Sequence, residues 1–194
     1  MLVKNTYSKG FTLIEILVTI AISVSFLVAI GKYFNESDYK NDATSIAGKT
    51  LDMLEGITQW NEGKSDCKSI GTPNIIAGGL APKEWTISDS SASWLERALT
   101  LRYKYGRLII NTNLLPAWLS GTGLNPTQGY AIIFQTYPRD KIPLFISQLM
   151  DSFDLIDVGG VIIKDENGIN QVLYNNVLND DVGTTTISLI TWGC

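Results

Sequence analysis

Residues 8–30 read SKGFTLIEILVTIAISVSFLVAI, an apolar run in which Glu15 is the one ionisable residue beyond Phe11. A helix over residues 11–30, at about 1.5 Å per residue, measures about 30 Å, which is the thickness of the hydrocarbon core of a bilayer. We therefore predict that this helix spans a membrane. A carboxylate at the centre of such a helix costs about 2.5 to 3.5 kcal/mol, and less near the interface, so its presence there indicates a function.

The residues in front of the apolar run are short and basic. They read MLVKNTYSKG and contain Lys4 and Lys9 but no acidic residue. By the positive-inside rule this end stays in the cytoplasm and the chain after Lys32 is exported. The run continues as AIGKYFNESDYK, without the small-residue cleavage pattern of a secretory signal, so we expect the apolar segment to be retained.

The string KGFTLIEILVTIAI resembles the processing site, or class III signal peptide, of type IV pilins and pseudopilins. In that family prepilin peptidase cuts between Gly and Phe, methylates the new Phe amine and leaves Glu as the fifth residue of the mature chain. The resemblance implies leader cleavage between Gly10 and Phe11, N-methylation of Phe11 and an assembly role for Glu15. A plain anchor helix or an uncleaved signal requires neither Gly10 nor Glu15.

The resemblance also implies why the membrane tolerates Glu15. In family filaments this carboxylate meets the N-terminal ammonium of a neighbouring subunit. Two opposite charges about 4 Å apart attract by roughly 4 kcal/mol at an effective dielectric constant of about 20. This attraction is comparable with the insertion cost, so the pair favours assembly in a fixed register.

Length and composition limit the remaining classes. The chain has 194 residues and divides into a leader over 1–10, a transmembrane or filament-core helix over 11–31, an amphipathic continuation over 32–62 and one exported head over 63–194. A net charge of -4 without a basic patch argues against nucleic acid as a partner. The chain contains no histidine, which removes histidine-based catalysis and most transition-metal sites. We predict no enzymatic activity, no catalytic or metal-binding residue and no cofactor.

The helical pattern continues beyond the apolar run. Apolar residues recur with the three-or-four spacing of an amphipathic helix at Tyr39, Ala43, Ile46, Ala47, Leu51, Leu54 and Ile57. One long helix is predicted from about Phe11 to Trp60, ending in the turn-rich string NEGKSD. Gly31 and Gly48 are its weak points, since each costs about 1 kcal/mol relative to alanine.

The exported part predicts a sheet with short helices. Residues 67–93 read as an irregular linker. Ser93 and Glu96 fit the capping box of a short helix, whereas the following LTLRYKYGRLIIN fits a strand better. Strands are predicted in GRLIIN, YAIIFQT, LIDVGGVIIK, NQVLYN and TTTISLITW, and a helix in PLFISQLMDSF. The string VIIKDENGINQVLY predicts a hairpin. The fold class is therefore α+β, with a long N-terminal helix packed on an antiparallel sheet, as in the pilin fold.

The two cysteines, Cys67 and Cys194, form an even pair in an exported chain, which favours one disulfide bond over two unpaired thiols. A bridge between them stabilises by about 5 kcal/mol at most on the chain-entropy model. It also ties the C-terminus to the start of the head.

The head resembles that of type IVb pilins, including the thin-pilus subunits of conjugative plasmids, in the order of GLAPKEW, GYAIIFQTYP, FDLIDVGG and TTTISL. Those pilins usually bridge a cysteine in the short helix to one between the last strands. Neither 144–149 nor 175–182 contains a cysteine here. The subclass, and with it major or minor subunit, therefore stays open.

Two weaker interpretations concern the head surface. Calcium ligands are conceivable at Asp165, Glu166 and Gly168, or at Asp180 and Asp181, but neither set has EF-hand spacing and turns use the same residues. Four tryptophans could line a carbohydrate or receptor surface: Trp85, Trp94, Trp118 and Trp192. Such residues more often belong to the core or its rim.

Together the residues and the resemblance predict a structural subunit of a type IV pilus serving adhesion, motility or conjugation. The precursor is expected in the inner membrane as a single-pass protein with its N-terminus inside, and the product in an extracellular pilus. Its partners would be other pilin subunits, prepilin peptidase, the membrane platform protein and the assembly ATPase. The alternatives are a pseudopilin of a type II secretion or DNA-uptake machine and a low-abundance minor pilin acting as a tip adhesin.

Overall fold

The computed structural model describes residues 13–64, 66–87, 93–112, 129–179 and 183–192. The chain divides into two compact units, Met1–Asn41 and Asp42–Cys194. Helix α1 (Leu13–Asn61) contributes residues to both, and it stays helical through Gly31 and Gly48, the two expected weak points. Among the described residues, no helix combines the length and the apolar character that a membrane span requires.

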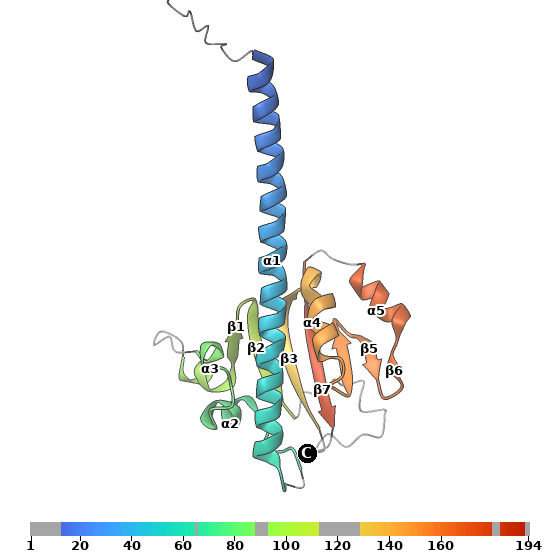
Figure 1. Cartoon of the computed structure of the whole chain (residues 1–194). Coiled ribbons are helices and arrows are strands. Elements are labelled where there is room, and N and C mark those ends of the chain that lie inside the picture. Colours follow the sequence, from blue (N-terminus) through green and yellow to red (C-terminus); the bar gives the residue numbers. More distant parts are fainter. Residues whose placement is uncertain (1–12, 65, 88–92, 113–128, 180–182, 193–194) are drawn as a thin grey trace, which may run out of the picture. The chain divides into compact units, whose positions relative to one another are not determined.

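The second unit contains a sheet of seven strands in the order β1-β2-β3-β7-β4-β5-β6 (Figure 1). The strands are β1 (Leu101–Tyr103), β2 (Gly106–Asn111), β3 (Gly129–Pro138), β4 (Leu155–Val158), β5 (Val161–Asp165), β6 (Gly168–Ile169) and β7 (Thr184–Trp192). Every neighbouring pair is antiparallel. The predicted α+β class with an antiparallel sheet is confirmed.

The core lies between one face of this sheet and the helices that cover it. Side chains alternate along each strand, so Ile132 of β3 and Leu189 of β7, which are opposite each other, both point to this face. Ile46, Met53 and Ile57 on the second half of α1 pack into the same buried cluster. This burial fixes which face of the helix meets the sheet.

An irregularity in β3 interrupts the alternation. Thr136 has a φ of 58°, and the register to β7 shifts between Phe134 and Tyr137. Because the bulge adds a residue, both aromatic rings enter the core, where each contacts Phe145. Gly106 lies against this bulge, since a Cβ on it would stand 2.0 Å from the Thr136 Oγ1 and 2.6 Å from the Gln135 carbonyl oxygen.

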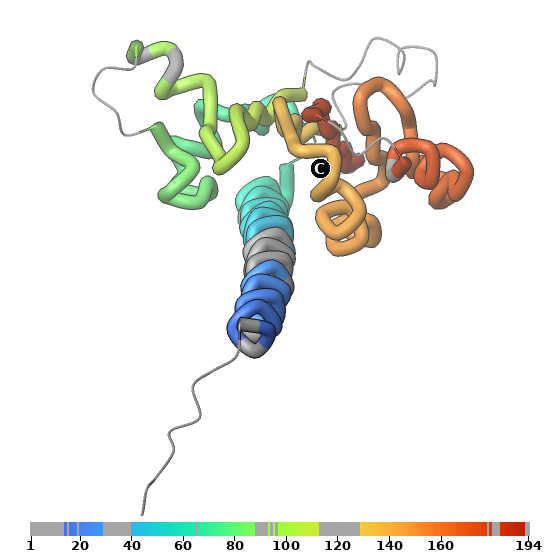
Figure 2. Tube along the Cα trace, turned by 90° about the horizontal axis from the view of Figure 1, so that it is seen from above, coloured from blue at the N-terminus to red at the C-terminus, as the bar shows by residue number. Residues whose placement is uncertain are grey.

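Shorter helices lie on the core face of the sheet and at both of its ends. They are α2 (Thr72–Ala77), η1 (Lys83–Trp85), α3 (Trp94–Leu99), η4 (Arg139–Lys141), α4 (Ile142–Leu149) and α5 (Gln171–Leu178). Helix α2 contacts α3 and β2, whereas α5 contacts β5. Seen along α1, the segments containing α2 and α3 and the one containing α5 therefore lie on opposite sides of the head (Figure 2).

Three sequence-based predictions for the head are wrong or incomplete. The linker over 67–93 contains α2 and η1, because Pro73 starts a helix whose Ile75 is buried. The single strand LIDVGGVIIK is a hairpin of β4 and β5, because Gly159 and Gly160 both have positive φ and reverse the chain. The third is the strand predicted in NQVLYN.

The strand predicted in NQVLYN is helix α5. Asn170 caps it, since its side-chain oxygen accepts a hydrogen bond of 3.2 Å from the Leu173 N–H. The predicted hairpin therefore exists only between β5 and the two-residue strand β6. Helix α4 ends at Leu149 and so covers only the first part of the predicted segment PLFISQLMDSF. The expected residues Ile142, Ile146 and Leu149 are buried on this helix, and Phe153 is buried beyond its end.

Candidate functional site

The residues that the sequence assigns to processing and assembly lie at the start of the chain. Gly10 and Phe11 lie outside the described residues, as does the side chain of Glu15. The backbone of Glu15 belongs to helix α1. Leader cleavage, methylation and the assembly role therefore stay predictions.

The described side chains of the first half of α1 form an exposed apolar surface. Exposed fractions between 47% and 70% occur at Ile14, Ile16, Leu17, Val18, Ile20, Ile22, Val24, Phe26, Leu27 and Val28. At 3.6 residues per turn these positions cover every side of the helix. The Ser25 hydroxyl is satisfied within the helix, because it donates 2.8 Å to the Ala21 carbonyl oxygen. A helix that is apolar on all sides requires an apolar environment rather than a single flat partner.

A charged cluster fixes the helix to the head at the start of the second unit. The Asp42 carboxylate oxygen Oδ2 lies 2.5 Å from the Lys104 Nζ, accepts a hydrogen bond of 2.7 Å from the Tyr105 hydroxyl and lies 3.5 Å from the Lys141 Nζ. Lys104 and Tyr105 form the turn between β1 and β2, and Lys141 belongs to η4. One carboxylate therefore joins α1 to two separate segments of the head.

The cluster shifts the pKa values of its members. Partial burial opposes ionisation of Asp42, but the hydrogen bonds from Lys104 and Tyr105 and the charges of both lysines outweigh it, so its pKa is lowered. The hydrogen bond to Asp42 raises the pKa of Lys104. Burial, and then the hydrogen bond to Asp42, raises the pKa of Tyr105. At neutral pH the carboxylate is therefore charged and the phenol is a donor.

Two more polar contacts join α1 to the head. Lys49 forms an ion pair of 2.5 Å with Glu84 of η1, and the Gln148 amide of α4 donates 3.0 Å to the Thr44 hydroxyl. Both contacts are partly exposed, so each adds little stability by itself. With the Asp42 cluster they fix the rotation of the helix on the sheet.

Cys67 is fully buried in the main core, and no cysteine among the described residues is a free thiol. Cys194 lies outside the described residues. The Cys67–Cys194 pairing therefore stays a prediction.

The other sequence candidates separate into turn and core residues. Asp165 accepts a hydrogen bond of 2.8 Å from the Asn167 N–H, which is a turn contact. Within the described ranges, no group of three or more acidic or sulfur ligands could hold a metal ion. Asp180 and Asp181 lie outside those ranges. Trp85 is buried in the core and Trp192 packs on the opposite face of the sheet, while Trp118 and the side chain of Trp94 are not described.

Sequence reasoning missed the Asp42 cluster and one buried acid. Asp157 of β4 is 5% exposed and stands opposite Ser188 of β7. Burial raises the pKa of Asp157, although the Gly160 N–H donates to its Oδ1. No local pattern marks either acid, because the partners of Asp42 come from distant segments and the burial of Asp157 depends on the pairing of β4 with β7.

Comparison with known families agrees with the N-terminal motif. Residues 5–31 match the prokaryotic N-terminal methylation motif, and this match supports a type IV pilin-like or pseudopilin protein. No curated protein matches the chain. The matched motif implies processing by prepilin peptidase, a membrane-anchored precursor and assembly into pilus-like filaments that end up outside the cell.

Proposed function

We propose that this chain is a structural subunit of a type IV pilus, cleaved between Gly10 and Phe11 and polymerised through the first half of α1. The observation that carries the proposal is the coincidence of two features in one segment. Residues 5–31 match the methylation motif, and the described side chains of the same segment expose apolar surface on every side of the helix. A helix that must pass from a membrane into a filament core needs this surface in both places.

The precursor is proposed to sit in the inner membrane with its N-terminus inside, because Lys4 and Lys9 precede the apolar run and no acid does. After cleavage the methylated amine of Phe11 is proposed to pair with the Glu15 carboxylate of an adjacent subunit. Pairing these charges removes the cost of keeping Glu15 in apolar surroundings. The platform protein and the assembly ATPase would extract the processed chain into the filament.

The head has a structural role in this proposal. The Asp42 cluster and the Lys49–Glu84 pair join the second half of α1 to three segments of the head, so force on the helix reaches the whole sheet. The role is proposed to be non-enzymatic, with adhesion, motility or conjugation as the process served.

The test is the intact mass of the protein in filaments sheared from cells. We expect the mass of the chain without MLVKNTYSKG, increased by one methyl group and decreased by two hydrogens if the cysteines pair. A chain that still begins at Met1 in sheared filaments would overturn the processing and the amine–carboxylate pairing. A processed chain found only in the membrane fraction would instead favour a pseudopilin.

A further inference from the structure

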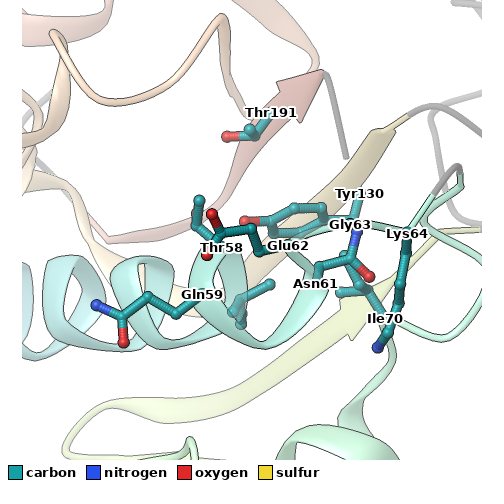
Figure 3. Close-up of a pocket in the computed structure, with 10 residues that line it drawn as sticks. Thr58, Gln59, Asn61, Glu62, Gly63, Lys64, Ile70, Tyr130 and Thr191 are labelled. Atoms are coloured by element: carbon teal, nitrogen blue, oxygen red, sulfur yellow. The ribbon is translucent and has the colours of Figure 1, made fainter.

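A cavity of about 410 Å³ lies beside the C-terminal end of α1 (Figure 3). Its floor is formed by Ile57 and Asn61 of the helix, Ile70 of the following segment, Tyr130 of β3 and Thr191 of β7. All five belong to the second unit. The volume falls within the range of about 300 to 1,000 Å³ that is usual for small-molecule sites.

The floor contains polar atoms that are buried and unpaired. Asn61 is 4% exposed, and neither its Nδ2 nor its Oδ1 has a hydrogen-bond partner among the described residues. The same holds for the hydroxyl oxygens of Tyr130 and Thr191. Buried polar groups are normally paired, so unpaired ones gathered around one cavity indicate that something else satisfies them.

The fold holds these groups in place. Tyr130 and Thr191 are direct cross-strand partners, so their side chains share one face of the sheet. Asn61 is the last residue of α1, where the Lys64 N–H donates 3.0 Å to its carbonyl oxygen and Gly63 has a φ of 82°. The helix end and the sheet thus place the backbones that carry the amide and the two hydroxyls independently of any ligand.

Burial raises the pKa of the Tyr130 phenol, and the neighbouring Thr58 hydroxyl opposes this shift without cancelling it. The Thr58 hydroxyl donates its own proton to the Leu54 carbonyl oxygen at 2.9 Å. The Thr58 proton is therefore already used, and the geometry leaves the Tyr130 hydroxyl without a hydrogen-bond partner among the described residues.

The chemistry of the floor selects the ligand. An amide offers a fixed donor and a fixed acceptor, and a hydroxyl offers both, so ligand hydroxyls are the complement of all three side chains. A charged ligand would lose its hydration without meeting a fixed opposite charge. The rim carries one charge of each sign, Glu62 and Lys64, and the Lys64 Nζ lies 3.2 Å from the centre of the Trp60 ring.

From these observations we propose that the cavity binds a neutral, hydroxyl-rich small molecule, such as a single sugar residue, through Asn61, Tyr130 and Thr191. Glu62 and Lys64 are exposed and lie at the rim, so neither supplies a buried charge to the floor. This binding goes beyond the filament function. Neither proposal depends on the other, because an unprocessed chain retains the cavity.

The test uses the full chain in a detergent without sugar headgroups. Glucose, N-acetylglucosamine and glycerol are titrated and followed by saturation-transfer NMR, with methylammonium and acetate, which carry methyl protons, as charged probes. We expect saturable binding of at least one neutral probe with a dissociation constant in the millimolar range or below, and no binding of the charged probes. Binding is expected to weaken at least about tenfold in Tyr130→Phe and Thr191→Val, which keep the shape of each side chain.

The control is Ser147→Ala, which removes an exposed hydroxyl of α4 that donates to the Leu144 carbonyl oxygen. It should bind like the wild type. The Tm of the ligand-free Tyr130→Phe and Thr191→Val variants, measured alongside, should not fall, because removing an unpaired buried polar group is nearly neutral or stabilising. The proposal is overturned if no neutral probe saturates, which would mean water alone fills the cavity. Equal binding by all variants, or preference for a charged probe, would overturn it as well.

Discussion

The hydroxyl of Tyr105 donates a hydrogen bond of 2.7 Å to the carboxylate of Asp42, and this contact joins the turn between β1 and β2 to helix α1. The two residues are 63 positions apart in the sequence. The same carboxylate oxygen also pairs with Lys104 and Lys141. Its removal therefore tests how firmly the helix is fixed to the head.

Asp42→Ala is expected to destabilise the protein by about 1 kcal/mol, because it removes a charge-assisted hydrogen bond at a partly exposed site. The Tm should fall by about 2 to 4 °C for a chain of this size, as measured by thermal unfolding. Asp52→Ala, at an exposed position of the same helix, is the matched control and should change the Tm little. Equal losses in both variants would show that the cluster adds no stability.

The contribution of Asp42 should also depend on pH in a definite direction. Its folded-state pKa lies below the usual value of 3.8 for aspartate, so its contribution is complete above that value and is lost as the pH falls through the folded-state pKa. Asp42→Asn should therefore be less stable than the wild type at pH 6, and the difference should shrink toward pH 2. A difference that is constant from pH 6 to pH 2 would contradict the charge-based account.

Asp157 should behave in the opposite way. Burial raises its folded-state pKa, so the ionised acid reduces stability at neutral pH, and this loss disappears as the pH falls below the unfolded value near 3.8. Asp157→Asn keeps an acceptor for the Gly160 N–H and removes the charge. We expect its Tm to exceed that of the wild type at pH 7 and to equal it at pH 3. Asp151→Asn, at an exposed position, is the control.

Two glycine substitutions should have opposite effects on stability. Gly106→Ala places a Cβ against the Thr136 side chain and the Gln135 backbone and should destabilise by about 2 to 3 kcal/mol. Gly48→Ala lies in helix α1 with no atom within 4 Å of the new Cβ and should stabilise by about 1 kcal/mol. Denaturant unfolding of both variants checks the pair. A stable Gly106→Ala protein would mean that the bulge in β3 relaxes freely.

Cys194→Ser tests the proposed disulfide without placing a hydroxyl in the core, as Cys67→Ser would. We expect membrane insertion to be unchanged and the head to become sensitive to protease, because the closed loop no longer restricts the unfolded state. Digestion of both proteins under non-reducing conditions gives the comparison. An unchanged digestion pattern would indicate that the cysteines are unpaired.

Glu15→Val tests the assembly proposal. The variant should insert into the membrane and be cleaved, but it should not enter filaments, because its neighbour's amine has no carboxylate to meet. Glu55→Val, at an exposed position near the other end of α1, is the control and should assemble normally. Immunoblots of sheared and membrane fractions separate the outcomes, and normal incorporation of Glu15→Val would count against charge pairing.

The sequence predicts those elements whose cause is local. The three-or-four spacing from Tyr39 to Ile57 is sufficient for α1, and the β-branched content of GRLIIN and TTTISLITW is sufficient for β2 and β7. In NQVLYN the alternation favours a strand. The helix forms instead because Asn170 caps it and Val177 is buried against the core.

The residues of the candidate site also divide into those that the sequence predicts and those that it does not. The methylation motif is contiguous and can be recognised from the sequence. Asp42, Asp157 and the floor of the cavity cannot, because Asn61, Tyr130 and Thr191 meet only after β3 and β7 have paired. Contacts of this kind depend on register, which composition does not reveal.

The position of β7 has a consequence for how the head is made. Its neighbours are β3 and β4, so it alone connects the β1-β2-β3 half of the sheet to the β4-β5-β6 half. The described strands of both halves precede Thr184 in the chain, and no described strand of one half pairs with a strand of the other. Joining the halves therefore requires a long-range pairing, which is slow for topological reasons, and a head without its final strand would expose two unpaired strand edges.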